Sequence, residues 1–191
     1  KYPNTKHVQV DAVSYSGIIQ ANQASFGSAV VPHYQFDKAD VIVSFGADFL
    51  GTWISPLEFN RQYVTKRNMA SLKNKKMSRH IQVESGMSLT GTNADARIAV
   101  KPSEENLALL NLYAALGGSV PAQKLSSPAA EKGIAIAAKE LAAAKGRALV
   151  VSGSNDVAVQ TVVNAINALL GSYGTTVGLT NSSYQYTGND A

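Results

Sequence analysis

Three turns in the sequence carry the residue types that bind ligands in open α/β sheets. Each turn follows an apolar run typical of a buried strand, and ligands of such sheets lie beyond the carboxyl ends of the strands. Carboxylates in these turns could accept hydrogen bonds from ligand amides or hydroxyls, and glycines would let a ligand approach the backbone closely. The candidate ligand-binding residues are Gly46, Asp48, Glu84, Ser85, Gly86, Gly153 and Ser154.

The same turns lack the groups that nucleotide and metal sites need. Gly46, Gly51 and Thr52 partly match a phosphate-binding loop, but a glycine stands where a lysine should precede Thr52. No G-x-G-x-x-G fingerprint and no G-x-S-x-G nucleophile motif occurs. The three histidines have no metal-ligand spacing, and the chain contains no cysteine that could hold zinc or an iron–sulfur cluster. We therefore expect no catalytic residue and no metal site in this chain.

A structural role competes with ligand binding for several of these residues. Asp48 and Asp156 can accept hydrogen bonds from nearby backbone N–H groups, as in Asx turns and N-caps. His80, at the start of an apolar run, is interpreted as a hydrogen-bonded structural histidine. Trp53, which follows a sharp turn, is interpreted as a packing anchor for that turn.

The elements that must position these turns alternate between strands and helices. The strands are expected at 7–13, 29–31, 40–45, 81–84, 97–100, 147–152 and 175–177, and the helices at 14–26, 56–68, 104–116, 128–145 and 157–170. Ser55, Pro56 and Glu58 predict a capping box at the start of the second helix. The pattern predicts an α/β fold with a doubly wound, mostly parallel sheet and helices on both faces.

Composition places limits on size and surroundings. The chain has 191 residues, of which 45% are hydrophobic and 16% are charged, against roughly 25% charged in an average globular protein. Part of the surface is therefore expected to be covered by other protein. No run reaches the roughly 18 apolar residues of a membrane span. Both ends look cut, so we expect residues 1–191 to be a single α/β domain from a longer, multidomain protein.

The net charge of +4 is concentrated in one segment. Seven of the 17 basic residues lie between Arg61 and Arg79, and no acid occurs from Phe59 to Val83. Only Tyr63 could stack on a base within this segment, so nucleic acid is not an expected partner. Two interpretations remain, a solvated helix face and loop, or a docking patch for an acidic partner domain or subunit.

The order of these segments resembles the α/β core of the molybdopterin oxidoreductase family, relatives of dimethyl sulfoxide reductase and formate dehydrogenase. The resemblance covers most of residues 32–170, with its motifs at 32–34, 38–43, 81–84 and 94–102. It implies a Rossmann-like domain. In active members the turns after the first two strands read Gly-x-Asn-Pro and Asp-Pro-Arg, and both cradle a pterin guanine dinucleotide. Here an acid, Asp48, replaces the asparagine, and Gly86 replaces the arginine that would pair with a phosphate.

The segments 43–53 and 79–98 are most similar to one branch, the molybdopterin-like region of the iron–sulfur subunit of alternative complex III. That resemblance implies a non-catalytic scaffold or docking domain in a membrane-associated respiratory complex that oxidises quinol. Its partners would be other domains and subunits, at the periplasmic side of the inner membrane. Iron–sulfur clusters would lie in another part of the parent, and molybdopterin guanine dinucleotide is not expected here. Two alternatives stay open: a cofactor-binding fragment of an active molybdoenzyme, and a sugar- or metabolite-binding module with a pocket at Asp48, Glu84 and Ser154.

Overall fold

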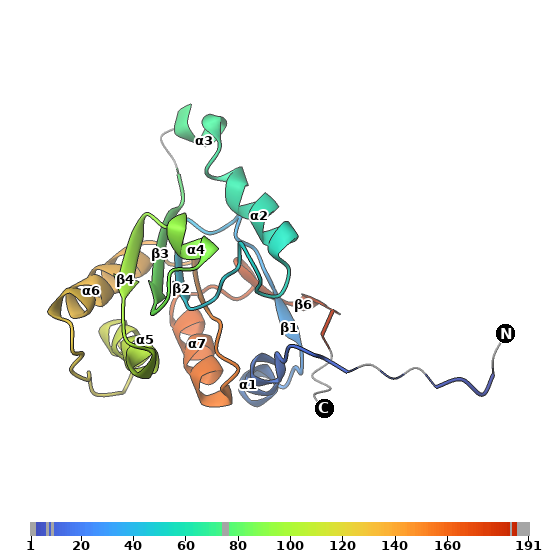
Figure 1. Ribbon diagram of the computed structural model, residues 1–191. Coiled ribbons are helices and arrows are strands. Elements are labelled where there is room, and N and C mark those ends of the chain that lie inside the picture. Colours follow the sequence, from blue (N-terminus) through green and yellow to red (C-terminus); the bar gives the residue numbers. More distant parts are fainter. Residues whose placement is uncertain (1–2, 7, 9, 74–76, 184, 187–191) are drawn as a thin grey trace.

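The computed structural model describes residues 3–6, 8, 10–73, 77–183 and 185–186, with only the backbone at 71 and 72 (Figure 1). The helices are α1 Ser16–Phe26, α2 Pro56–Thr65, α3 Met69–Lys73, α4 Leu89–Thr92, α5 Glu105–Ala115, α6 Pro128–Ala143 and α7 Val157–Leu169, with a 3-10 turn, η1 Pro102–Glu104, before α5. The strands are β1 Val31–Tyr34, β2 Val41–Phe45, β3 Arg79–Glu84, β4 Ala96–Ala99, β5 Ala148–Ser152 and β6 Val177–Ser183. None of these helices is long and apolar enough to cross a bilayer.

Four parallel strands form the central sheet in the order β4-β3-β2-β5. Every residue of β2 and β5 is buried, as their largely apolar sequences predict for strands covered on both faces. The predicted α/β class with a parallel sheet is therefore confirmed. The arrangement, a parallel sheet flanked by helices, is compatible with a doubly wound fold.

Each face of the sheet has its own apolar core. One core joins alternate residues of β2 and β3, such as Val43 and Ile81, to α5, α6 and α7. The other joins Ile42 and Leu149 to α1, α2 and the pair β1–β6. Figure 1 shows α5 and α6 on one side of the sheet and α2 on the other.

The expected strands at the two ends of the chain were wrong. Residues 29–31 were expected to end at Pro32, but β1 continues through Pro32 to Tyr34 and pairs antiparallel with β6, apart from the main sheet. A strand was expected at 175–177, but β6 begins at Val177 and continues to Ser183. No strand forms among the described residues of 7–13, where Val8, Val10 and Val13 are 75%, 56% and 61% exposed. An alternating pattern forms a strand only where the edge of another strand can accept its hydrogen bonds. Residues 7 and 9 of this expected strand lie outside the described residues.

Helix α2 begins at Pro56 as predicted, but its capping box does not form. The Ser55 side chain makes no capping hydrogen bond. Instead of turning back to the cap, Glu58 accepts hydrogen bonds from His33 of β1 at 2.9 Å and from Gln62 at 3.1 Å. The helix ends at Thr65 rather than near residue 68. The tertiary contact with β1 therefore replaces the local cap.

The outer edge of β5 is closed by side chains instead of another strand. Asn167 of α7, only 2% exposed, accepts from the Val150 N–H at 3.0 Å and donates to the Val150 carbonyl at 2.7 Å. The hydroxyls of Ser172 and Thr176 donate to the Ala148 carbonyl at 2.8 Å and 2.6 Å. These contacts satisfy buried backbone groups that would otherwise lack partners.

Candidate functional site

The three candidate turns meet at one edge of the sheet, as their sequence positions predict. Phe45, Val83 and Ser152 pair side by side at the ends of β2, β3 and β5. Gly46 then donates its N–H to the Val83 carbonyl at 2.9 Å, and Gly153 donates to the Phe45 carbonyl at the same distance. A Cβ on Gly153 would lie 2.6 Å from the Gly46 carbonyl oxygen. This glycine is therefore required by backbone packing, with no need of a ligand.

Asp48 attaches its turn to α4. Its Oδ1 accepts from the Thr90 N–H at 2.9 Å and from the Thr90 hydroxyl at 2.7 Å. Its backbone carbonyl accepts the N–H groups of residues 51, 52 and 53. Asp48 therefore has a structural role, but the backbone N–H that its side chain accepts belongs to Thr90 in α4 and not to its own turn, where the Thr52 hydroxyl donates to Oδ2 at 3.5 Å.

Glu84 is a buried carboxylate whose acceptor positions are used inside the protein. It is 3% exposed and accepts from Arg97 Nε at 2.7 Å, from the Ser88 hydroxyl at 2.7 Å and from Gln82 Nε2 at 3.2 Å. Burial favours its neutral form, but the hydrogen bonds from Ser88 and Arg97 outweigh burial and hold the pKa of Glu84 below its ordinary value. A Cβ on Gly91 would overlap Oε1, so this glycine makes room for the carboxylate.

Glu105, which the sequence interpretation assigned only to a helix start, also reaches this edge. Its Oε1 accepts the Ser85 N–H at 3.0 Å, and its Oε2 lies 3.4 Å from the position that a Cβ on Gly46 would take. A carboxylate in the first turn of α5 is favoured by the helix dipole. Gly86 has no atom within 4 Å of its Cβ position. The edge therefore carries Asp48, Glu84 and Glu105, and the Ser85 N–H is used by an internal carboxylate.

The turn after β5 caps the start of α7. Oδ1 of Asp156 accepts from the N–H groups of Ala158 at 2.7 Å and Val159 at 3.1 Å, which confirms its expected role as the N-cap. The Ser154 hydroxyl accepts from the Asp156 N–H at 3.1 Å, and its carbonyl accepts from Gln160 Nε2 at 2.5 Å. Ser154 is therefore part of the capping structure.

A buried polar row leads from this edge along β3. His80 Nε2 lies 3.4 Å from Gln82 Oε1, and Gln82 continues the row to Glu84. His80 Nδ1 lies 3.1 Å from the Tyr63 hydroxyl, which confirms the interpretation of a hydrogen-bonded structural histidine. Trp53 is 5% exposed and packs on Tyr34 and Phe59, as expected of an anchor.

Burial of His80 predicts a loss of stability in mild acid. Burial lowers its pKa from 6.5 to about 4, so the unfolded chain binds a proton between these values that the folded protein does not. The free energy of unfolding should fall by about 2 kcal/mol between about pH 7.5 and about pH 5. The pKa values of Glu84 and Asp95 lie below their ordinary range, so protonation of these two carboxylates lowers stability only at more acidic pH.

Urea unfolding at the two pH values checks this expectation. His80→Gln, which cannot titrate, should abolish most of the fall. His33→Gln, at the half-buried histidine of β1, should preserve it. A wild-type protein equally stable at both pH values would contradict the assignment of His80 as the acid-sensitive group.

Much of the basic segment is used within the fold. Arg67 pairs with Asp95 at 2.7 Å, Lys66 with Asp40 at 2.5 Å and Arg79 with Glu140 at 3.1 Å. Among the described members of the segment, Arg61 and Lys73 are exposed and form no ion pair. Lys75 and Lys76 lie outside the described residues. Any docking role of the described segment therefore falls on Arg61 and Lys73.

No protein-family model matches this chain, and no curated protein matches it. Within the described residues, no group of three His, Cys, Asp or Glu side chains could hold a metal ion.

Proposed function

We propose that this chain is a non-catalytic, Rossmann-like domain of the molybdopterin-oxidoreductase type. It would act as a scaffold and docking module in the iron–sulfur subunit of a membrane-associated respiratory complex that oxidises quinol. The observation that carries the proposal is the set of three internally hydrogen-bonded carboxylates, Asp48, Glu84 and Glu105, at the ligand-binding edge of the sheet. The iron–sulfur clusters of that subunit would lie outside this chain. The subunit would lie on the periplasmic side of the inner membrane.

The residues at this edge do not fit the pyrophosphate of a guanine dinucleotide. A phosphate needs cations or free N–H donors. The turns after β2, β3 and β5 contain no lysine or arginine, Arg97 is paired with Glu84, and the Ser85 N–H is taken by Glu105. Two like charges 4 Å apart near a protein surface repel by about 4 kcal/mol. The edge therefore opposes the binding of the anion that the family's cofactor carries.

The exposed face of α2 supports a docking role. Leu57, Arg61 and Val64 are spaced i, i+4 and i+7, so they lie on one face of the helix. Leu57 is 88% exposed and Val64 is 52% exposed. Large apolar side chains beside an unpaired cation suit a contact with another domain or subunit that carries acidic groups.

Calorimetric titration with GDP, the nucleotide half of the cofactor, tests the proposal. The wild-type chain is expected to show no saturable binding up to millimolar GDP. The double variant Asp48→Asn/Gly86→Arg should gain measurable affinity, because it restores the amide and the cation. Asp37→Asn/Ser119→Arg is the matched control, since it adds the same positive charge elsewhere and should gain none.

Micromolar binding of GDP by the wild-type chain would overturn the proposal and support a cofactor-binding fragment of an active molybdoenzyme. Stoichiometric molybdenum in the purified parent complex, measured by elemental analysis, would also overturn the proposal and support an active molybdoenzyme.

A further inference from the structure

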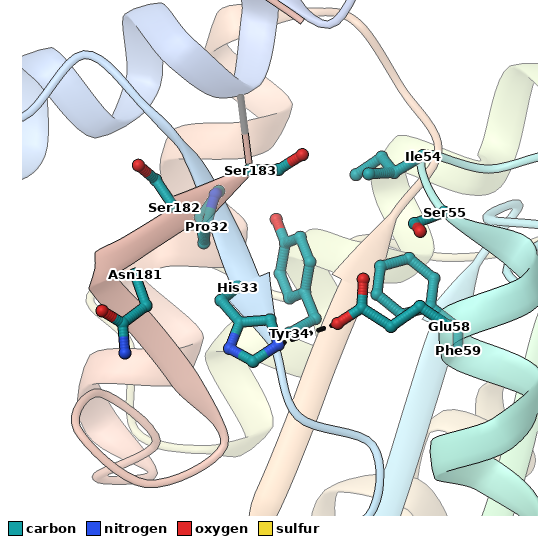
Figure 2. A pocket seen from close by; sticks show the side chains of 10 residues that line it. All are labelled: Pro32, His33, Tyr34, Ile54, Ser55, Glu58, Phe59, Asn181, Ser182 and Ser183. Atoms are coloured by element: carbon teal, nitrogen blue, oxygen red, sulfur yellow. Dashed lines mark hydrogen bonds and ion pairs between the residues drawn. The ribbon is translucent and has the colours of Figure 1, made fainter. Parts of the chain in front are cut away.

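A hollow of about 250 Å³ lies between β1, β6 and the first turn of α2 (Figure 2). It shares no lining residue with the carboxylate edge of the sheet. Strand β1 contributes His33 and Tyr34, α2 contributes Glu58 and Phe59, and β6 contributes polar residues at its far end. The hollow is therefore a separate site, and its chemistry can be considered independently of the proposed function.

Glu58 gives the hollow its charge. Among the described residues that line it, Glu58 is the sole acid, and there is no lysine or arginine. Its Oε1 accepts from His33 Nε2 at 2.9 Å and from Gln62 Nε2 at 3.1 Å. Its second oxygen, Oε2, has no hydrogen-bond partner among the described residues, and Figure 2 shows it directed into the hollow. His33 thus orients the carboxylate and leaves one acceptor open.

Tyr34 supplies a second polar group without a partner. Its side chain is buried, with only 4% of the residue exposed, and its hydroxyl makes no hydrogen bond within the described part of the chain. Figure 2 shows this hydroxyl facing the hollow from the side opposite His33. Burial raises the pKa of Tyr34, so the hydroxyl stays neutral. Among the described residues, the buried side-chain atoms without a partner are Trp53 Nε1 and Ser78 Oγ, so the Tyr34 hydroxyl is open to the hollow and available to a ligand.

Apolar side chains form another part of the wall, beside the polar residues of β6 and Ser55. The rings of Tyr34 and Phe59 and the side chains of Ile54 and Pro32 line the hollow. Aromatic rings attract cations, and aliphatic walls favour a hydrocarbon stem. An anion would instead meet the Glu58 carboxylate without any compensating lysine or arginine.

We propose that this hollow binds a primary ammonium or guanidinium group carried on a short apolar stem. The cation would donate to Oε2 of Glu58 and to the Tyr34 hydroxyl, and the stem would pack on Ile54 and Pro32. A free alkylamine and the lysine or arginine side chain of a partner protein share this chemistry. His33 acts as a positioning residue.

Titration followed by NMR tests this site, with n-butylammonium and a lysine-containing tripeptide as probes. n-Butanol and butyrate serve as neutral and anionic controls of the same size. Binding of the cations in the millimolar range is expected, with butyrate excluded and butanol much weaker. Glu58→Gln keeps the acceptor for His33 but removes the charge, so it should weaken cation binding by at least about tenfold.

Two further variants separate the site from non-specific charge attraction. Tyr34→Phe should weaken binding severalfold without changing the charge. Asp37→Asn removes one charge outside the hollow and should leave binding unchanged.

Saturable binding of n-butylammonium would indicate that free amines are ligands, whereas binding of the tripeptide alone would assign the site to a partner's side chain. Butanol or butyrate binding as tightly as the cations would overturn the proposal. So would cation binding that survives Glu58→Gln, or the absence of binding by both probes.

Discussion

Replacement of Asn167 by leucine is expected to lower the free energy of unfolding by roughly 2–6 kcal/mol. The side-chain amide of Asn167 is the partner of both the N–H and the carbonyl of Val150, in a fully buried strand. Leucine has a similar size but no polar atom, so two buried backbone groups would lose their partners at once. Each such group costs about 1–3 kcal/mol.

Urea unfolding of two further variants checks the cause. Asn167→Asp keeps an acceptor for the Val150 N–H but sets a carboxylate against the carbonyl, so it should also be strongly destabilising. Asn106→Leu changes an exposed asparagine of α5 and should shift stability by no more than about 0.5 kcal/mol. An Asn167→Leu protein as stable as the Asn106→Leu control would refute the role of this amide in closing the sheet.

Gly17→Ala should destabilise the protein by roughly 2–3 kcal/mol, although alanine favours a helix over glycine by about 1 kcal/mol. The Gly17 N–H donates to Asn155 Oδ1 at 2.8 Å, which holds the start of α1 against the turn before α7. A Cβ at this position would overlap the backbone carbonyl of Asn155 in that turn. Either α1 or the turn must then move, and α1 packs along α7.

Gly86→Ala is the matched control for this substitution, since a Cβ there meets nothing within 4 Å. It should change the free energy of unfolding by less than about 0.5 kcal/mol. Thermal and urea unfolding of both variants give the comparison. A Gly17→Ala protein more stable than wild type would show that helix propensity outweighs the close approach.

The central sheet was predicted well because the sequences of its strands have strong local patterns. The run 41–45 is apolar except for Ser44, and Asp156 with Val157 marks the start of α7 at the expected residue. The pair β1–β6 could not be predicted in the same way. A strand of four residues containing Pro32 has a weak local pattern, and its pairing with β6 depends on where the chain returns after the whole sheet has formed.

The candidate site was predicted in position but not in its contacts. The turns at Gly46, Glu84 and Gly153 do meet at one edge, because parallel strands bring their carboxyl ends together. The partners of Asp48 and Glu84, which are Thr90 and Arg97, lie on other elements, so no local spacing in the sequence predicts these contacts. Glu105 could have been noticed, since an acid at the first turn of the helix after β4 lies at the same edge of the sheet.

The pairing of β1 with β6 also bears on the order in which the molecule is assembled. Val31 pairs with Ser183, so this seam joins segments from near the two ends of the described chain. The entropy of closing this loop is lost before the contacts of the seam can contribute any stability. The parallel sheet can be complete while the seam is still open. Backbone amides of the seam should accordingly exchange with solvent sooner than those of β2, and an occupant of the adjoining hollow would slow their exchange.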